Sequence, residues 1–181
     1  MPSERSSLDR DRPHADDHEL MSAPLLVQVT HRFNVPAERV FDAWLTPSLA
    51  GRFFFATRTG NILRCEIEPE VGGSFTVTDR RPHADGDESV FDAEHRGTYV
   101  EIDRPRRLVF DFSVPPYLDA PSRVAIDIVP LGVSACELTL THDMGDSRYA
   151  HEYEDQARNG WVKMLATLDK ELFTRRIGIL S

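Results

Sequence analysis

A single long helical pattern at the C-terminal end, preceded by a run of short strand patterns, constrains this fold most. Residues 147–174 carry apolar side chains at the three- and four-residue spacing of one helix face: Trp161, Met164, Leu165, Leu168 and Leu172. Ser147 is a candidate N-cap for this helix. Gly160 lies inside it, where glycine costs about 1 kcal/mol relative to alanine. We therefore expect Gly160 to allow close packing against a strand or to leave room for a ligand.

Seven other segments alternate between apolar and polar residues, as half-buried strands do. The first covers 25–34 and is followed by two short helical patterns, one opened by Pro36 and one covering 47–54. The other six segments cover 63–68, 74–80, 96–102, 108–112, 123–130 and 136–140. Because the connections are short, the strands should pair antiparallel in a meander. The sequence predicts an α+β fold in which a curved antiparallel sheet wraps around the long helix, with a cavity between them.

Composition limits the domain organisation and the classes of partner. The chain of 181 residues carries 21 basic and 30 acidic side chains, for a net charge of −9, which argues against nucleic-acid binding. Residues 1–22 are polar and predicted to be a disordered tail, and 23–178 are predicted to form one domain. The sequence has neither a signal pattern nor an apolar run long enough for a bilayer, so we expect a cytoplasmic protein without membrane contact.

The sequence gives no indication of a metal or cofactor. Cys65 and Cys136 are isolated, which favours two half-buried thiols over a disulfide or a zinc site. His151 and Asp155 lie one helical turn apart, but two groups do not make a metal site. The glycines at 72–73 lack the lysine and following helix of a phosphate loop, so they indicate a turn.

Residues 97–110, GTYVEIDRPRRLVF, resemble a segment of the activator of heat-shock protein 90 ATPase homologue-like proteins. These belong to the START-like (SRPBCC, Bet v 1-like) superfamily. Four further segments are similar to the family's opening strand and helix, its Gly-Gly hairpin, its last strand and its final helix: 33–44, 71–75, 138–142 and 160–172. The resemblance implies a helix-grip fold with a hydrophobic cavity. The chain departs from the family where a second tryptophan often follows the first helix, since residues 52–55 read RFFF here.

The resemblance leaves three functions open. The first is a carrier or sensor that holds a small apolar ligand between sheet and helix. The second is a protein-interaction module with a chaperone-like partner, resembling the chaperone activator and predicting a filled core. The third is a cyclase- or dehydratase-like enzyme, which needs at least two titratable groups facing the cavity. Only His31 and Asp79 are candidates, so the sequence favours a non-enzymatic role. It does not distinguish a monomer from a homodimer.

Each candidate group also has a structural interpretation. His31 could orient a ligand or act as a base, or it could be a core histidine with a satisfied hydrogen bond. Asp79 could face the cavity with a raised pKa, or it could lie in water at a strand end. The aromatic run 53–55 could form a lid or partner surface, or it could seal the core. The residues predicted to line the cavity are His31, Phe33, Phe41, Trp44, Phe54, Phe75, Val77, Asp79, Val100, Phe110, Phe112, Ile126, Tyr153, Ala157, Gly160, Trp161 and Met164.

Overall fold

A computed structural model describes residues 23–83, 88–115 and 118–178, so the predicted tail at 1–22 lies outside the described residues. The elements follow one another in the order β1 (Leu26–Phe33), α1 (Ala37–Leu45), α2 (Pro47–Phe53), β2 (Asn61–Ile67), β3 (Ser74–Pro82), β4 (Val90–Asp103), β5 (Arg107–Val114), β6 (Leu118–Pro130), β7 (Cys136–Asp143), α3 (Arg148–Glu152) and α4 (Glu154–Gly178).

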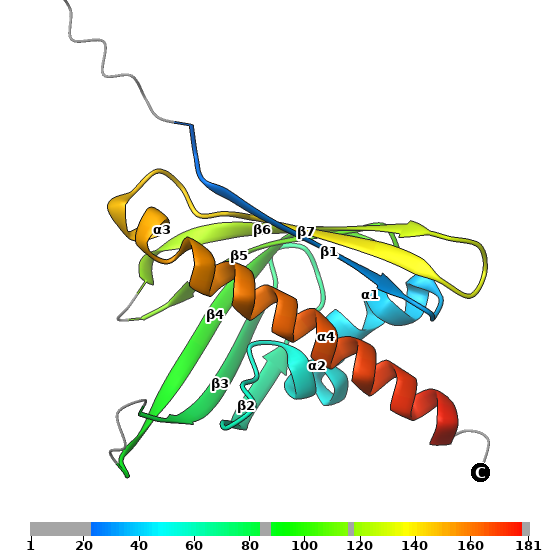
Figure 1. The fold of residues 1–181 in the computed structure, drawn as a ribbon, viewed down its shortest axis with the longest axis horizontal. Helices are drawn as coiled ribbons and strands as arrows, with labels where there is room; N and C mark the ends of the chain where they lie inside the picture. The colour runs from blue at the N-terminus through cyan, green and yellow to red at the C-terminus, as the bar shows by residue number, and fades with distance from the viewer. Residues whose placement is uncertain (1–22, 84–87, 116–117, 179–181) are drawn as a thin grey trace, which may run out of the picture.

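The strands form one antiparallel sheet in the order β1-β7-β6-β5-β4-β3-β2. Strands β2 to β7 form the predicted meander, and β1 pairs with β7 along its whole length. Helix α4 lies diagonally across one face of this sheet (Figure 1). The predicted α+β helix-grip fold is therefore confirmed. No helix within the described ranges has the length and apolarity needed to cross a bilayer.

Strands β3, β4 and β6 are longer than the sequence predicts. The polar stretch 82–92 is expected as a loop, yet β3 and β4 remain paired as far as Pro82 and Val90. The outer parts of these strands are exposed, and Arg80 pairs with Asp92 across them, so the apolar alternation that marks a strand is missing. Strand β6 already begins at Leu118, which pairs with Val114 of β5. The register between the two strands shifts before Ser122, near Pro121, which cannot donate a hydrogen bond to the ladder.

The predicted helix at 147–174 is divided into α3 and α4. Tyr153 interrupts it with φ −104° and ψ 8°, outside helical geometry. Its ring stacks on Tyr149 with centroids 4.3 Å apart. The predicted cap is confirmed, because Ser147 Oγ accepts a 3.1 Å hydrogen bond from the Ala150 backbone N–H.

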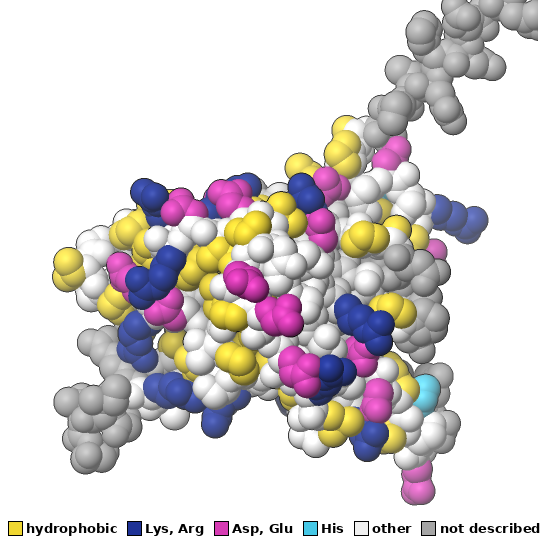
Figure 2. All heavy atoms as spheres, turned by 180° about the vertical axis from the view of Figure 1, so that it is seen from behind, with side chains coloured by type: hydrophobic (Ala, Val, Ile, Leu, Met, Phe, Trp, Pro, Cys, Tyr) yellow, Lys and Arg dark blue, Asp and Glu magenta, His cyan; other side chains and the backbone are white. Residues whose placement is uncertain are grey.

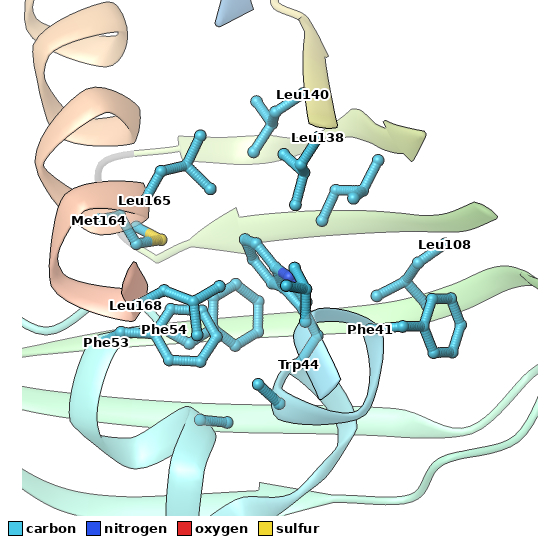
Figure 3. Packing of buried hydrophobic residues seen from close by; sticks show 14 of the residues in the cluster. Phe41, Trp44, Phe53, Phe54, Leu108, Leu138, Leu140, Met164, Leu165 and Leu168 are labelled. Atoms are coloured by element: carbon cyan, nitrogen blue, oxygen red, sulfur yellow. The ribbon is translucent and has the colours of Figure 1, made fainter. Parts of the chain in front are cut away.

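The apolar core lies between the sheet, the two short helices and the C-terminal half of α4. Figure 3 shows Leu165 and Leu168 of α4 near Leu138 and Leu140 of β7, with Trp44 of α1 between the layers. Phe53 and Phe54 pack edge-on against Trp44, with centroids 5.0 and 5.4 Å away. The aromatic run therefore begins in the core, as its structural interpretation predicts, and does not form an exposed lid.

Gly97 sits where β4 passes directly beside the Phe75 ring. A Cβ at this position would lie 2.2 Å from two ring carbons of Phe75 and 2.5 Å from the Asp111 carbonyl oxygen. Phe75 is buried and Asp111 O is backbone, so neither can move away easily. We expect Gly97→Ala to lower the free energy of unfolding by about 2–3 kcal/mol, as overpacked cores do. Urea denaturation measures this, and an unchanged midpoint would contradict the close contact.

Opposed ion pairs cover the outer side of the sheet. Arg80 Nε lies 2.7 Å from Asp92, Arg107 Nη1 2.6 Å from Asp127, and Arg123 Nε 2.8 Å from Asp111. Each pair joins residues directly opposite on neighbouring strands. Figure 2 shows basic and acidic side chains interspersed over this view of the molecule. On this face, the described side chains gather into no continuous basic patch of the kind that neutralises phosphates.

Candidate functional site

A cavity of about 1000 Å³ opens between the N-terminal half of α4 and the sheet. Its volume is at the upper end of the range for small-molecule sites. Strands β3 to β7, α3 and the segment after α2 all contribute to it. The lining residues are Phe55, Ala56, Thr57, Arg81, His83, Phe91, Ala93, His95, Phe112, Val114, Ser122, His142, Met144, Tyr149, Tyr153, Gln156, Ala157, Asn159, Gly160, Trp161, Lys163 and Met164.

Six of the predicted residues lie in this lining: Phe112, Tyr153, Ala157, Gly160, Trp161 and Met164. The added Cβ of an alanine at Gly160 would meet no atom within 4 Å, so this glycine leaves room beside the cavity and does not mediate close packing. Eight others are buried in the core away from the lining: Phe33, Phe41, Trp44, Phe54, Phe75, Val77, Phe110 and Ile126. Periodicity identified the inner face but did not locate the cavity on it.

Val100 is exposed, contrary to its predicted place in the cavity. Tyr99 opposes Phe110 and Glu101 opposes Val109, so Val100 is the extra residue of a bulge in β4. The bulge reverses the alternation, and the inward side chain of this stretch is Tyr99, which is buried. The alternation of 96–102 places Thr98, Val100 and Ile102 on one side of the strand, but the bulge separates them: Thr98 and Val100 are exposed, whereas Ile102 packs against the core.

His31 does not line the cavity but ties β1 to α4. Its Nε2 lies 2.9 Å from Asp169 Oδ2. Its ring contacts Phe33, with centroids 4.6 Å apart. The satisfied-histidine interpretation is the one that fits, although the side chain is partly exposed rather than fully buried.

Asp79 is completely buried, contrary to the interpretation that places it in water. Its Oδ2 accepts hydrogen bonds from Arg81 Nε at 2.7 Å and from Thr57 Oγ1 at 2.8 Å. Arg81 Nη2 also donates to the Phe55 carbonyl at 3.2 Å. Asp79 thus lies behind the cavity wall and holds Arg81 and Thr57, which belong to the lining.

Three lining residues form a hydrogen-bonded relay. Trp161 Nε1 donates to His142 Nδ1 at 3.1 Å, and His142 Nε2 lies 2.8 Å from Ser122 Oγ. An indole N–H can only donate, so Nδ1 of His142 carries no proton. Burial lowers the pKa of His142 to about 4, which keeps the ring neutral near pH 7. The single ring proton is therefore on Nε2, which donates to Ser122 Oγ.

A second buried histidine lies deeper in the lining. The His95 ring stacks on Phe55, with centroids 4.1 Å apart and planes 9° from parallel. Burial and the nearby Arg81 charge lower the pKa of His95 to about 3. Its Nδ1 is buried without a hydrogen-bond partner among the described residues. Phe55 itself adopts a positive φ of 56°, unusual for a bulky residue, and this places its ring between core and cavity.

Sequence reasoning missed the relay and His95, although two signals were available. His142 shares the parity of Leu138 and Leu140 in a clean alternating strand, so it had to point inward. His95 shares the parity of Gly97 and Tyr99, the inward residues before the bulge. Ser122 had no such signal, because it lies between a loop expected to end at Pro121 and a strand expected to begin at Arg123.

Among the described residues, the lining contains basic and neutral side chains only. Arg81 and Lys163 are its cations, and no aspartate or glutamate of the described chain belongs to it. No group of three or more His, Cys, Asp or Glu side chains in the described ranges is arranged to hold a metal ion. The described lining therefore presents apolar surface, two cationic donors and neutral polar groups, among them the Gln156 and Asn159 amides, which both donate and accept hydrogen bonds.

Comparisons with known proteins agree with this architecture. Structures similar in fold include protein NE0264 from Nitrosomonas europaea, at 19% identity and a TM-score of 0.68 over 83% of this chain and 96% of that one. Protein CV1439 from Chromobacterium violaceum is 19% identical, with a TM-score of 0.66 over 81% of this chain and 96% of that one. No curated protein sequence matched. The family model described as Activator of Hsp90 ATPase homolog 1-like protein matches residues 34–172, most of the chain, which therefore belongs to that family.

Proposed function

We propose that this protein binds a small, largely apolar molecule in the cavity beneath α4, as a carrier or sensor. The observation that supports this most strongly is the cavity of about 1000 Å³ between α4 and the sheet. Aromatic and aliphatic side chains form much of its wall, including Phe55, Phe112 and Trp161. Burial of apolar ligand surface would supply the binding energy, at about 25 cal/mol per Å².

The hydrogen-bond relay argues against a serine hydrolase. Nucleophilic catalysis needs an unprotonated histidine nitrogen next to the serine hydroxyl. Here the Trp161 N–H occupies Nδ1 of His142 and leaves the proton on Nε2, next to Ser122. His142 therefore cannot accept the serine proton. Of the two groups considered for acid–base catalysis, neither His31 nor Asp79 lines the cavity.

The interaction-module alternative receives less support. It predicts a filled interior, whereas the cavity is large. Three of the exposed large apolar residues, Val129, Leu131 and Val133, lie together at the end of β6 and in the β6–β7 turn, whereas Leu63 on β2 and Phe173 on α4 belong to separate elements. A group confined to one turn supports an interaction module less than the large cavity supports ligand binding.

Gly160→Leu should strongly weaken binding of the apolar dye N-phenyl-1-naphthylamine while the protein remains folded. The leucine side chain would extend from α4 into space that is open in the wild type. We expect at least a tenfold rise in the dissociation constant, measured by fluorescence titration. Circular dichroism and the melting temperature report folding.

Gly160→Ala is the matched control, since it changes the backbone preference without filling the cavity. It should bind the dye nearly as the wild type does and be more stable by about 0.5–1 kcal/mol. A wild-type protein that does not bind the dye, or a leucine variant that binds it equally well, would contradict the proposed site.

A further inference from the structure

We infer that the ligand carries an acceptor oxygen, a carbonyl or a carboxylate, that is hydrogen-bonded by the Ser122 hydroxyl at the end of the Trp161–His142–Ser122 relay. This inference rests on the proposed binding function and specifies its ligand class. It assigns to Ser122 the role of orienting an otherwise apolar molecule in the cavity.

The direction of the relay determines what Ser122 can offer. Trp161 donates to His142, and His142 donates in turn to Ser122 Oγ. A serine hydroxyl that accepts from the histidine still has its own hydrogen to donate. Ser122 lines the cavity, and its one hydrogen bond within the described part of the chain is this one to His142. The hydroxyl hydrogen is thus available to an acceptor inside the cavity.

His95 provides an independent indication that a polar group enters. His95 is only 6% exposed and lines the same cavity. Its Nδ1 has no hydrogen-bond partner in the described residues. A buried polar atom without a partner costs free energy unless water or a ligand satisfies it. A hydrocarbon ligand that displaces water from His95 Nδ1 would leave this atom unsatisfied.

The charges of the lining select the kind of polar group. Lys163 and Arg81 belong to the lining, whereas Asp79, which offsets Arg81, lies behind the wall. The serine hydroxyl, the lysine ammonium and the guanidinium all donate hydrogen bonds. An oxygen acceptor satisfies these donors, whereas an ammonium group would meet like charge without an acidic partner among the described lining residues. We therefore expect ketones and carboxylates to be bound in preference to amines.

Paired naphthalene probes test this inference by displacement of N-phenyl-1-naphthylamine. The ketone 2-acetylnaphthalene and the hydrocarbon 2-isopropenylnaphthalene have nearly the same shape, but only the ketone has an acceptor oxygen. Ser122→Ala should weaken ketone binding about three- to tenfold, the range of one net hydrogen bond, and leave hydrocarbon binding unchanged. Ser113→Ala is the matched control, because Ser113 follows Phe112 on β5 and lies outside the lining. It should affect neither probe.

The preferred charge of the bound probe and the tautomer of His142 provide two further tests. Wild-type protein should bind 2-naphthoate more tightly than 2-naphthylmethylammonium at pH 7. Nitrogen-15 NMR of the imidazoles should show His142 protonated at Nε2. The inference would be overturned if Ser122→Ala affected the ketone and the hydrocarbon equally, or if the protein bound 2-naphthylmethylammonium more tightly than 2-naphthoate. A proton on His142 Nδ1 would overturn it as well. If the hydrocarbon binds but the ketone is insensitive to Ser122→Ala, the proposed function survives and this inference fails. If neither probe binds the wild type, both are wrong.

Discussion

Replacement of Arg81 by methionine should lower the free energy of unfolding by about 3 kcal/mol at pH 7. The Asp79 carboxylate is completely buried and would lose the closer of its two hydrogen-bond donors. Removal of one partner from a buried ion pair costs about 3–5 kcal/mol, and the partial exposure of Arg81 places this pair at the lower end. Urea denaturation monitored by tryptophan fluorescence measures the loss.

Arg80, which precedes Arg81 on β3, provides the control. Arg80 pairs with Asp92 at 2.7 Å, but both side chains are about half exposed. Exposed pairs contribute less than about 1 kcal/mol, so Arg80→Met should be nearly neutral. The double variant Asp79→Asn/Arg81→Met should recover most of the stability, because it no longer buries a charge. Equal losses in the two single variants would show that the Asp79 environment is not special.

Acidification from pH 8 to pH 5 should destabilise the protein through His95 and His142. Burial lowers the pKa of His95 to about 3 and that of His142 to about 4, whereas both start from 6.5 in the unfolded chain. Below pH 6.5 the unfolded chain therefore binds protons that the folded protein does not. The free energy of unfolding consequently decreases as the pH is lowered. At pH 5 each histidine accounts for about 2 kcal/mol of the loss.

Neutral replacements separate these two residues from other titrating groups. His142→Asn retains an acceptor for the Trp161 N–H, and His95→Gln retains a polar amide in the cavity wall. Each variant should reduce the dependence of unfolding free energy on pH between 5 and 8 by about half. A variant whose pH dependence equals that of the wild type would show that its histidine is not buried in neutral form.

The sequence alone predicts most of the fold because the signals for it are local. Alternation identified all seven strands, and three- and four-residue spacing identified α4, since each depends only on which face a side chain occupies. The exceptions have local causes too. The bulge at Val100 reverses the alternation without a glycine or proline to mark it, and Tyr153 interrupts the last helix although its spacing fits a continuous one.

The site was less accessible to sequence reasoning because its chemistry depends on distant residues. The role of His142 is determined by Trp161, 19 positions away, and that of His31 by Asp169, 138 positions away. Inward parity indicates that a histidine faces the interior, but not whether a donor or an acceptor meets each nitrogen. Likewise, periodicity places Phe41 on the apolar face of its helix and Phe112 on the apolar face of its strand. Only the packing shows that Phe41 lies in the core and that Phe112 lines the cavity.

The two halves of α4 are packed differently, so they should tolerate amino-acid substitution to different degrees. Leu165, Leu168 and Leu172 anchor its later turns in the core, whereas the turns that carry Gln156 and Gly160 border the cavity. Substitutions in the bordering turns change the shape of the cavity without creating voids in the core. We therefore expect sequence variation among related proteins to concentrate in the turns of α4 that border the cavity, while the later turns stay constrained by folding.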